Sequence, residues 1–286
     1  PNCGSSRKLT PKHKRRKARH RTGNTMTTTA PNPKTLNDAI EQHTRPSTFP
    51  LGIKMVTSAA RIPEKAKRPG RDLKVDSALC QGMSIARHYG WTIAVSRDDI
   101  SCPIGATLFG FQPQVERFTQ GHCCAGMYTK DAAAGTKTEA AAPCFSFGQY
   151  YAMVTGPLNR IDFEPDVVLV FGTPAQVMRL VTGALWESGG YIHSRFSGRT
   201  DCADEVIETM QTGKPQVILP CYGDRIFGQT QDHEMAFAFP YSFAQALMTG
   251  LEGTHKGGVR YPIPHYLRYT GTFPPSYEEL RNHWPK

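Results

Sequence analysis

The chain has 286 residues, of which 39% are hydrophobic and 20% are charged, and its net charge at neutral pH is +10. This length is enough to bury a substantial core. The sequence has no apolar run of about 18 residues, so we expect no membrane-spanning helix. No apolar segment follows the basic pairs near the start either, so we expect neither a secretory nor a twin-arginine signal.

The positive charge is concentrated at one end of the chain. Residues 1–21 hold nine basic residues and no acidic one. Because residues 1–34 are also poor in large apolar side chains, they predict a disordered basic tail. This tail is either a solvated extension or an arm for RNA, a membrane surface or a protein partner. The remaining chain is nearly neutral, so nucleic-acid binding is not expected outside the tail.

Residues 35–286 are expected to form a single α/β domain. The first expected elements are a helix over 36–44, a strand over 50–58, a helix over 75–90 and a strand over 91–96. Residues 112–148 are irregular and low in complexity. We interpret them as an inserted loop or helix that covers a site.

Strands and helices alternate after this insertion. The expected strands are 150–158, 165–172, 191–199 and 215–219, and the expected helices are 173–190, 201–213 and 239–258. This alternation predicts a mixed, largely parallel sheet flanked by helices. In such sheets ligands collect where strands end, and Cys102 and Cys221 follow two predicted strands.

Four cysteines lie where a predicted strand or helix meets a turn: Cys80, Cys102, Cys202 and Cys221. Thiolates are suited to iron–sulfur clusters, zinc or copper(I). Cys202 lies in the first turn of a predicted helix, where the helix dipole favours a thiolate. The pattern predicts a cysteine-bound metal centre, with inert buried thiols and a nucleophilic or redox thiol as alternatives.

A competing metal candidate is the run His122-Cys123-Cys124, with Cys144 as a further partner. The alternative is that Cys123 and Cys124 are loop thiols that oxidise. The sequence outside the tail has seven cysteines and no C-x-x-C spacing, which does not favour complete disulfide pairing. We therefore expect a reducing, cytoplasmic compartment.

Polar residues crowd the segment after the last predicted strand. They are Tyr222, Gly223, Asp224, Arg225, Gln229, Thr230, Asp232, His233 and Glu234, beside Phe227, Phe237 and Phe239. The pattern predicts either a polar pocket with aromatic walls or a buried structural network. As a pocket, it would use Asp224 or Glu234 for proton transfer, with Arg225 and Tyr222 holding the substrate.

A second polar segment precedes Cys202. Ser197 and Arg199 are suited to binding an anionic group of the substrate.

Several segments resemble a bacterial and archaeal family called domain of unknown function 169. They include LCQGMSIAR, DDISCPIGATLFGF, PDVVLVFGTPAQVMRLV and the long run SRFSGRTDCADEVIETMQTGKPQVILPCYGDRIFGQTQDHEMAFAFP. The resemblance extends from about residue 45 to residue 267. It implies that the four cysteines share motifs with Ser197, Gly198, Arg199, Gly223, Asp224, Arg225 and Glu234. It implies no reaction.

These patterns together predict an iron–sulfur protein that performs redox chemistry on a small anionic or aromatic substrate. A redox partner and a homo-oligomeric state are compatible with this interpretation. One alternative is a carrier or accessory subunit that binds a tetrapyrrole or a metal without turnover. Another is a structural zinc protein whose basic arm binds RNA or a partner.

Overall fold

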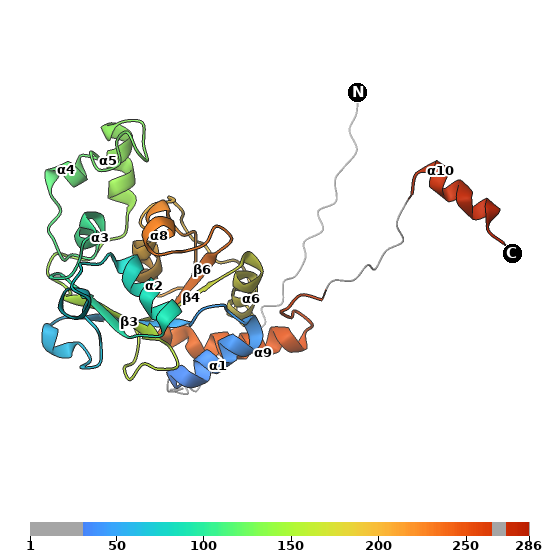
Figure 1. Ribbon diagram of the computed structural model, residues 1–286, viewed down its shortest axis with the longest axis horizontal. Coiled ribbons are helices and arrows are strands. Elements are labelled where there is room, and N and C mark those ends of the chain that lie inside the picture. The colour runs from blue at the N-terminus through green and yellow to red at the C-terminus, as the bar shows by residue number, and fades with distance from the viewer. Residues whose placement is uncertain (1–30, 265–272, 286) are drawn as a thin grey trace, which may run out of the picture.

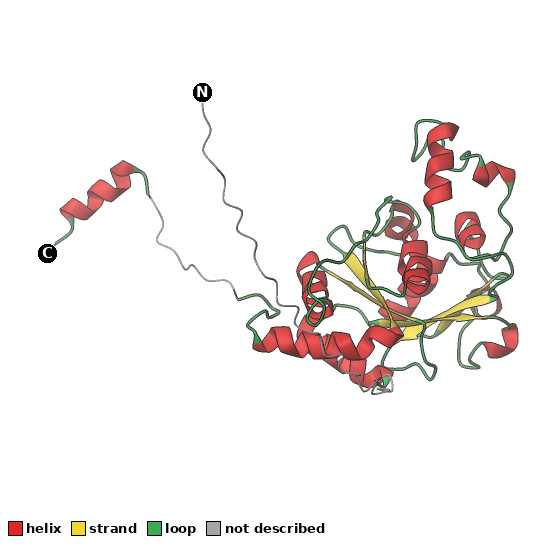
Figure 2. Cartoon of the chain, turned by 180° about the vertical axis from the view of Figure 1, so that it is seen from behind, coloured by secondary structure: helices red, strands yellow, loops and turns green. Residues whose placement is uncertain are grey.

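The computed structural model describes residues 31–264 and 273–285. The predicted tail therefore lies outside the described residues as far as position 30. The body of the protein is a six-stranded sheet between layers of helices (Figures 1 and 2).

The strands are β1 (Leu51–Val56), β2 (Ile93–Ser96), β3 (Ala152–Pro157), β4 (Val167–Gly172), β5 (Gln216–Ile218) and β6 (Met235–Pro240). The α-helices are α1 (Pro33–Thr44), α2 (Leu79–Tyr89), α3 (Pro103–Leu108), α4 (Glu116–Thr119), α5 (Ala132–Ala141), α6 (Pro174–Ala184), α7 (Thr209–Thr212), α8 (Tyr222–Phe227), α9 (Ala244–Lys256) and α10 (Pro275–Glu278). Shorter 3-10 or π-helical segments are η1 (Ala59–Arg61), η2 (Pro69–Leu73), η3 (Ala203–Glu208), η4 (Tyr241–Phe243) and η5 (Glu279–His283).

The sheet order is β2-β3-β1-β4-β6-β5, and every pairing is antiparallel. The prediction of a largely parallel sheet is therefore wrong. The helix-containing connections β1 to β2 and β4 to β5 do join strands that run in the same direction. In each case, however, another strand lies between the two: β3 separates β1 from β2, and β6 separates β4 from β5. The alternation of strands and helices is correct, but it does not show which strands are neighbours.

Side chains of the central strands alternate between two cores, as a pleated strand requires. On β4, Leu169 and Phe171 face a core shared with α2 and η3, whereas Val168 and Val170 face a core shared with α1, α6 and α9. All four side chains are at most 3% exposed. The sheet is thus covered on both faces, which explains why β4 is a continuous apolar run.

Two local predictions are wrong. Residues 191–199 form no strand, and Tyr191 is 85% exposed. The sequence predicts no strand over β6, since it assigns residues 239–240 to the start of the helix 239–258 and Phe237 to the wall of a pocket. Phe237 and Phe239 belong to β6 and are fully buried in the core beside α6 and α9, so they cannot be pocket walls.

In the described part of the chain, none of the helices combines the length and the apolar character needed to cross a bilayer.

Candidate cysteine-lined site

All four predicted metal ligands line one pocket of about 590 Å³. We call this pocket the cysteine pocket and call Cys80, Cys102, Cys202 and Cys221 the cysteine quartet. Each member lies in or beside the first turn of a helix, at α2, α3, η3 and α8 respectively. Residues more than a hundred positions apart in the sequence therefore meet at one surface of the fold.

Two members of the quartet accept hydrogen bonds from backbone amides. The Cys102 sulfur caps α3 and accepts from the Gly105 N–H at 3.3 Å, with Pro103 in the first helical position. The Cys221 sulfur caps α8 and accepts from the Asp224 N–H at 3.4 Å. Amide hydrogen bonds to sulfur are one means by which proteins tune iron–sulfur ligands.

The segments that lead into Cys80 and Cys102 are bonded to each other. The Ser77 N–H donates to the Asp99 carbonyl at 2.8 Å, and the Ser101 N–H donates to the Ser77 carbonyl at 3.2 Å. These backbone bonds fix the start of α2 relative to the start of α3.

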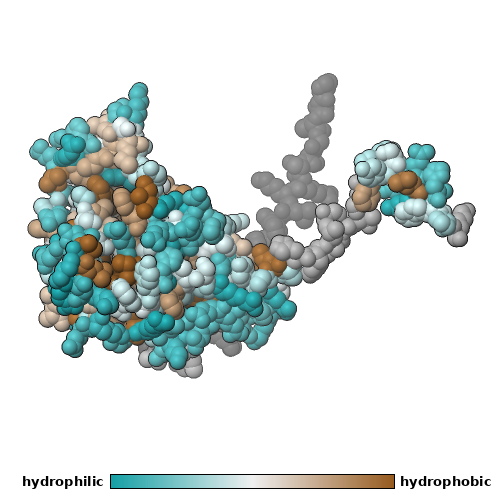
Figure 3. Space-filling view, viewed as in Figure 1, coloured by the Kyte–Doolittle hydropathy of each residue, from teal (hydrophilic) through white to brown (hydrophobic). Residues whose placement is uncertain are grey.

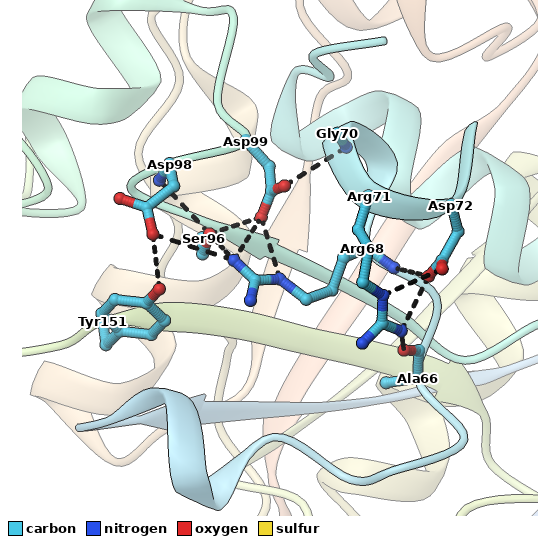
Figure 4. Close-up of polar contacts among 9 residues, drawn as sticks. All are labelled: Ala66, Arg68, Gly70, Arg71, Asp72, Ser96, Asp98, Asp99 and Tyr151. Carbon is cyan, nitrogen blue, oxygen red and sulfur yellow. Dashed lines mark hydrogen bonds and ion pairs between the residues drawn. The ribbon is translucent and has the colours of Figure 1, made fainter. Parts of the chain in front are cut away.

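A buried carboxylate strengthens the same junction (Figure 4). Asp99 is 4% exposed and accepts from the Arg68 guanidinium at 3.2 and 3.3 Å, from the Gly70 N–H at 3.2 Å and from the Ser96 hydroxyl. Arg68 also donates to the Ser96 hydroxyl at 3.0 Å. The loop between β2 and Cys102 is therefore held in place by charge-assisted hydrogen bonds.

The quartet lies among acidic side chains. Asp201 and Asp224 line the cysteine pocket, and both are at most 3% exposed. Burial, reinforced by Asp201, raises the pKa of the Cys221 thiol to about 12. Burial also raises the pKa of the Cys80 and Cys202 thiols above the usual range. Three of the four sulfurs are thus poor thiolates in the metal-free protein, which disfavours a nucleophilic role.

The segment 112–148, predicted to be an insertion, contributes three residues to the pocket. Cys123, Met127 and Tyr128 lie in its lining. Met127 is 66% exposed, and Phe227 of α8, which lines the same pocket, is 56% exposed. Figure 3 shows hydrophobic residues, in brown, on the part of the molecule that carries α3 and α8.

The other cysteines of the insertion point elsewhere. The buried Cys124 thiol donates to Glu139 at 3.1 Å, and the Cys144 sulfur accepts from the Gln114 amide at 3.3 Å. Neither Cys124, Cys144 nor His122 lines the cysteine pocket. All the cysteines that the structure describes are free thiols.

The remaining predicted site residues are divided by the structure. Asp224 and Arg199 line the cysteine pocket, and Ser197 lines an adjoining one. Burial and the charge of Asp201 raise the pKa of Asp224 to about 7.

Glu234, Arg225 and Tyr222 are not in the lining of either pocket. Glu234 forms a buried bidentate ion pair with Arg87, with both N–O distances 2.9 Å. Burial alone would raise the pKa of Glu234, but hydrogen bonds from Arg87 and the Gln231 N–H hold it below its usual value. Arg225 donates to the Gln231 carbonyl at 2.6 Å, and Tyr222 is 59% exposed. Glu234 and Arg225 thus make structural contacts and Tyr222 lies at the surface, so none of the three lines the pocket.

Sequence reasoning missed three buried charged residues near the pocket: Asp201 in its lining, and Glu205 and Arg87, whose charges interact with one another. None of the three is singled out from the sequence as a site residue. Glu205 is 1% exposed, and neither of its carboxyl oxygens has a hydrogen-bond partner among the described residues. A signal was available in the sequence. Asp201 directly precedes Cys202 and Glu205 follows it by three residues, all on the same helix.

The structure does not bring the described side chains together as the ligands of a single metal ion. Among residues 31–264 and 273–285, no three His, Cys, Asp or Glu side chains are close enough together to hold one metal ion. A single tetrahedral zinc needs every sulfur at about 2.3 Å from the same ion. A four-iron cluster instead takes one thiolate at each iron, so its ligands lie farther apart.

The fold and this pocket define a mixed α/β protein with a cysteine-lined cavity. A family model of domain of unknown function 169, described as "Uncharacterised ArCR", matches residues 39–250. The chain belongs to this family. It is also similar to the uncharacterized protein MJ0308 of Methanocaldococcus jannaschii, with 28% identity over 205 residues that cover 71% of this chain and 86% of that protein. No solved structure matches the chain.

Proposed function

We propose that the cysteine quartet binds an iron–sulfur cluster and that the protein uses it for redox chemistry on a small anionic or aromatic molecule. The observation that carries this proposal is the presence of all four distant cysteines in the lining of one pocket. Four thiols are the usual ligand set of a four-iron cluster. The amide hydrogen bonds to Cys102 and Cys221 add support.

Cluster binding would deprotonate the quartet, three of whose thiols have a raised pKa. Without a nearby cation, burial and the neighbouring carboxylates favour the protonated form of these thiols. A bound metal displaces their protons, because its charge stabilises the thiolate directly. When bound, such a cluster supplies one-electron transfer between a redox partner and the substrate.

The chain's own residues give the pocket its selectivity. Arg199 is the cation of the lining and would pair with an anionic group. Asp224 lies in the same lining, so it is better placed than Glu234 to exchange a proton with the substrate. Met127, Tyr128 and Phe227 supply apolar and aromatic contacts for the body of the ligand.

The test is a cysteine-to-serine series on the full chain purified without oxygen. Wild-type protein should be brown and contain iron and acid-labile sulfide. C80S, C102S, C202S and C221S should each lose most of the iron, because removal of one ligand destabilises the whole centre. Serine at Cys102 and Cys221 keeps a helix-capping oxygen, so folding should be preserved and can be checked by circular dichroism.

The matched control is C144S, since Cys144 is a half-buried thiol outside the cysteine pocket. It should keep the wild-type iron content. Iron that persists in all four quartet variants would refute the proposal. A colourless protein with one zinc per chain would instead support a structural zinc site, and a sharp tetrapyrrole band would support a carrier.

A further inference from the structure

A second pocket of about 470 Å³ adjoins the cysteine pocket. We call it the side pocket. The two share Tyr128, Arg199 and Thr200 in their linings, so these residues form the wall between them. A ligand longer than the cysteine pocket would extend past this wall.

Three cations line the side pocket, Lys137, Arg195 and Arg199, against one acid, Asp204. The acids that pair with the two arginines are outside the lining. Glu208 binds Arg195 at 2.6 Å, and Glu139 binds Arg199 Nη1 at 2.6 Å. Because the cations face the cavity and their partners do not, the side pocket favours an anion.

Arg199 is the group that most directly indicates a ligand. It is 5% exposed, and its Nη2 has no hydrogen-bond partner among the described residues. A buried guanidinium nitrogen without a partner is costly unless a ligand supplies an acceptor. Lys137 comes from α5, on the insertion, and has no ion-pair partner in the part of the chain that the structure describes.

The rest of the lining suits a carbon skeleton. Ala141, Ala142 and Pro143 form an apolar wall, and Phe196, which is 56% exposed, presents an aromatic ring. Ser197 and Thr138 add hydroxyl groups. Apolar walls with a few cationic and hydroxyl groups are typical of sites for organic acids.

We infer that the side pocket binds the carboxylate of an elongated organic acid, through Arg199 and Lys137, while the other end of the molecule reaches the cysteine pocket. This inference rests on the proposed function, because it specifies the class of substrate that the cysteine pocket would act on. Binding of the carboxylate itself requires no metal. The insertion then selects the substrate, since it supplies Lys137 and Tyr128 to the binding surface.

The experiment is a fluorine NMR titration of the full chain with 4-fluorobenzoate, using the neutral 4-fluorobenzamide as the matched ligand. Fluorobenzoate should bind and the amide should not. R199K keeps the positive charge beside Glu139 but loses the paired N–H donors of the guanidinium. It should weaken fluorobenzoate binding about tenfold. K137M, an exposed change that cannot disturb the core, should weaken it about two- to fivefold.

K130M is the control, because Lys130 is an exposed lysine of the same insertion outside both pockets. It should bind like wild type. The inference is overturned if the amide binds as well as the acid, if K130M weakens binding as much as K137M, or if nothing binds. Displacement by inorganic phosphate at a lower concentration than by benzoate would also overturn the carboxylate assignment.

Metal content measured on the same samples separates the two proposals. Fluorobenzoate binding that depends on Lys137 in a protein that takes up no iron would leave the side pocket intact and refute the cluster. Iron bound by the quartet with no acid binding would refute the side pocket alone.

Discussion

The helices α1, α6 and α9 and the helices around the cysteine pocket cover opposite faces of one sheet, and one buried polar side chain from each face, Gln176 and Glu205, can be compared. On α6, Gln176 is 6% exposed and makes three hydrogen bonds: it accepts from the Thr173 N–H and donates to the Thr44 and Arg45 carbonyls. Behind the cysteine pocket, Glu205 is just as buried and makes none among the described residues. The buried amide of Gln176 is thus satisfied by hydrogen bonds, whereas, within the described part of the chain, the buried carboxyl of Glu205 is not, and unsatisfied buried polar groups are a feature of many functional sites.

The largest effect should come from breaking the ion pair on the cysteine side. Arg87 is 1% exposed, binds Glu234 through two hydrogen bonds and stacks over the Phe171 ring at 4.0 Å. R87M leaves Glu234 buried without its partner, so the free energy of unfolding should fall by about 3–5 kcal/mol. Urea unfolding measures this change.

The double variant R87M/E234Q is the control for this pair. It removes the unpaired charge and should recover part of the lost stability. A loss of less than about 1 kcal/mol in R87M would show that the pair behaves like an exposed one. That result would contradict the view that the Arg87–Glu234 pair is a buried structural ion pair of this face.

A smaller effect separates the two faces directly. Burial, together with Asp201 and Asp224, raises the pKa of Glu205 well above its usual value, which favours the neutral carboxyl. E205Q replaces it with a neutral group of the same shape and should change the unfolding free energy by less than about 1 kcal/mol. Q176L, on the opposite face, abandons three hydrogen bonds and should cost about 1–3 kcal/mol. Equal losses in urea unfolding for both variants would contradict the comparison.

The sequence predicts the elements better than their arrangement. A helix is predicted from residue 173, and the structure begins α6 at Pro174 with Thr173 as its cap, in a capping box with Gln176. Antiparallel pairing could not be read from the chain, because β3 and β6 insert between strands that are connected by helices. Neighbours in a sheet depend on long-range contacts that no local pattern records.

The same division holds at the site. The positions of Cys80, Cys102, Cys202 and Cys221 at turns were visible in the sequence, and the structure brings them to one pocket. The sequence did not predict the roles of Asp201 and Glu205 near the quartet, or the side pocket. They arise because η3, the loop before it and the insertion pack together, which depends on the tertiary structure.

The most direct test of the account is anomalous diffraction at the iron absorption edge from crystals grown without oxygen. The account predicts iron peaks in the cysteine pocket, within bonding distance of the sulfurs of the quartet. Ordered, reduced sulfurs with no anomalous peak between them, in protein that was never exposed to air, would contradict it.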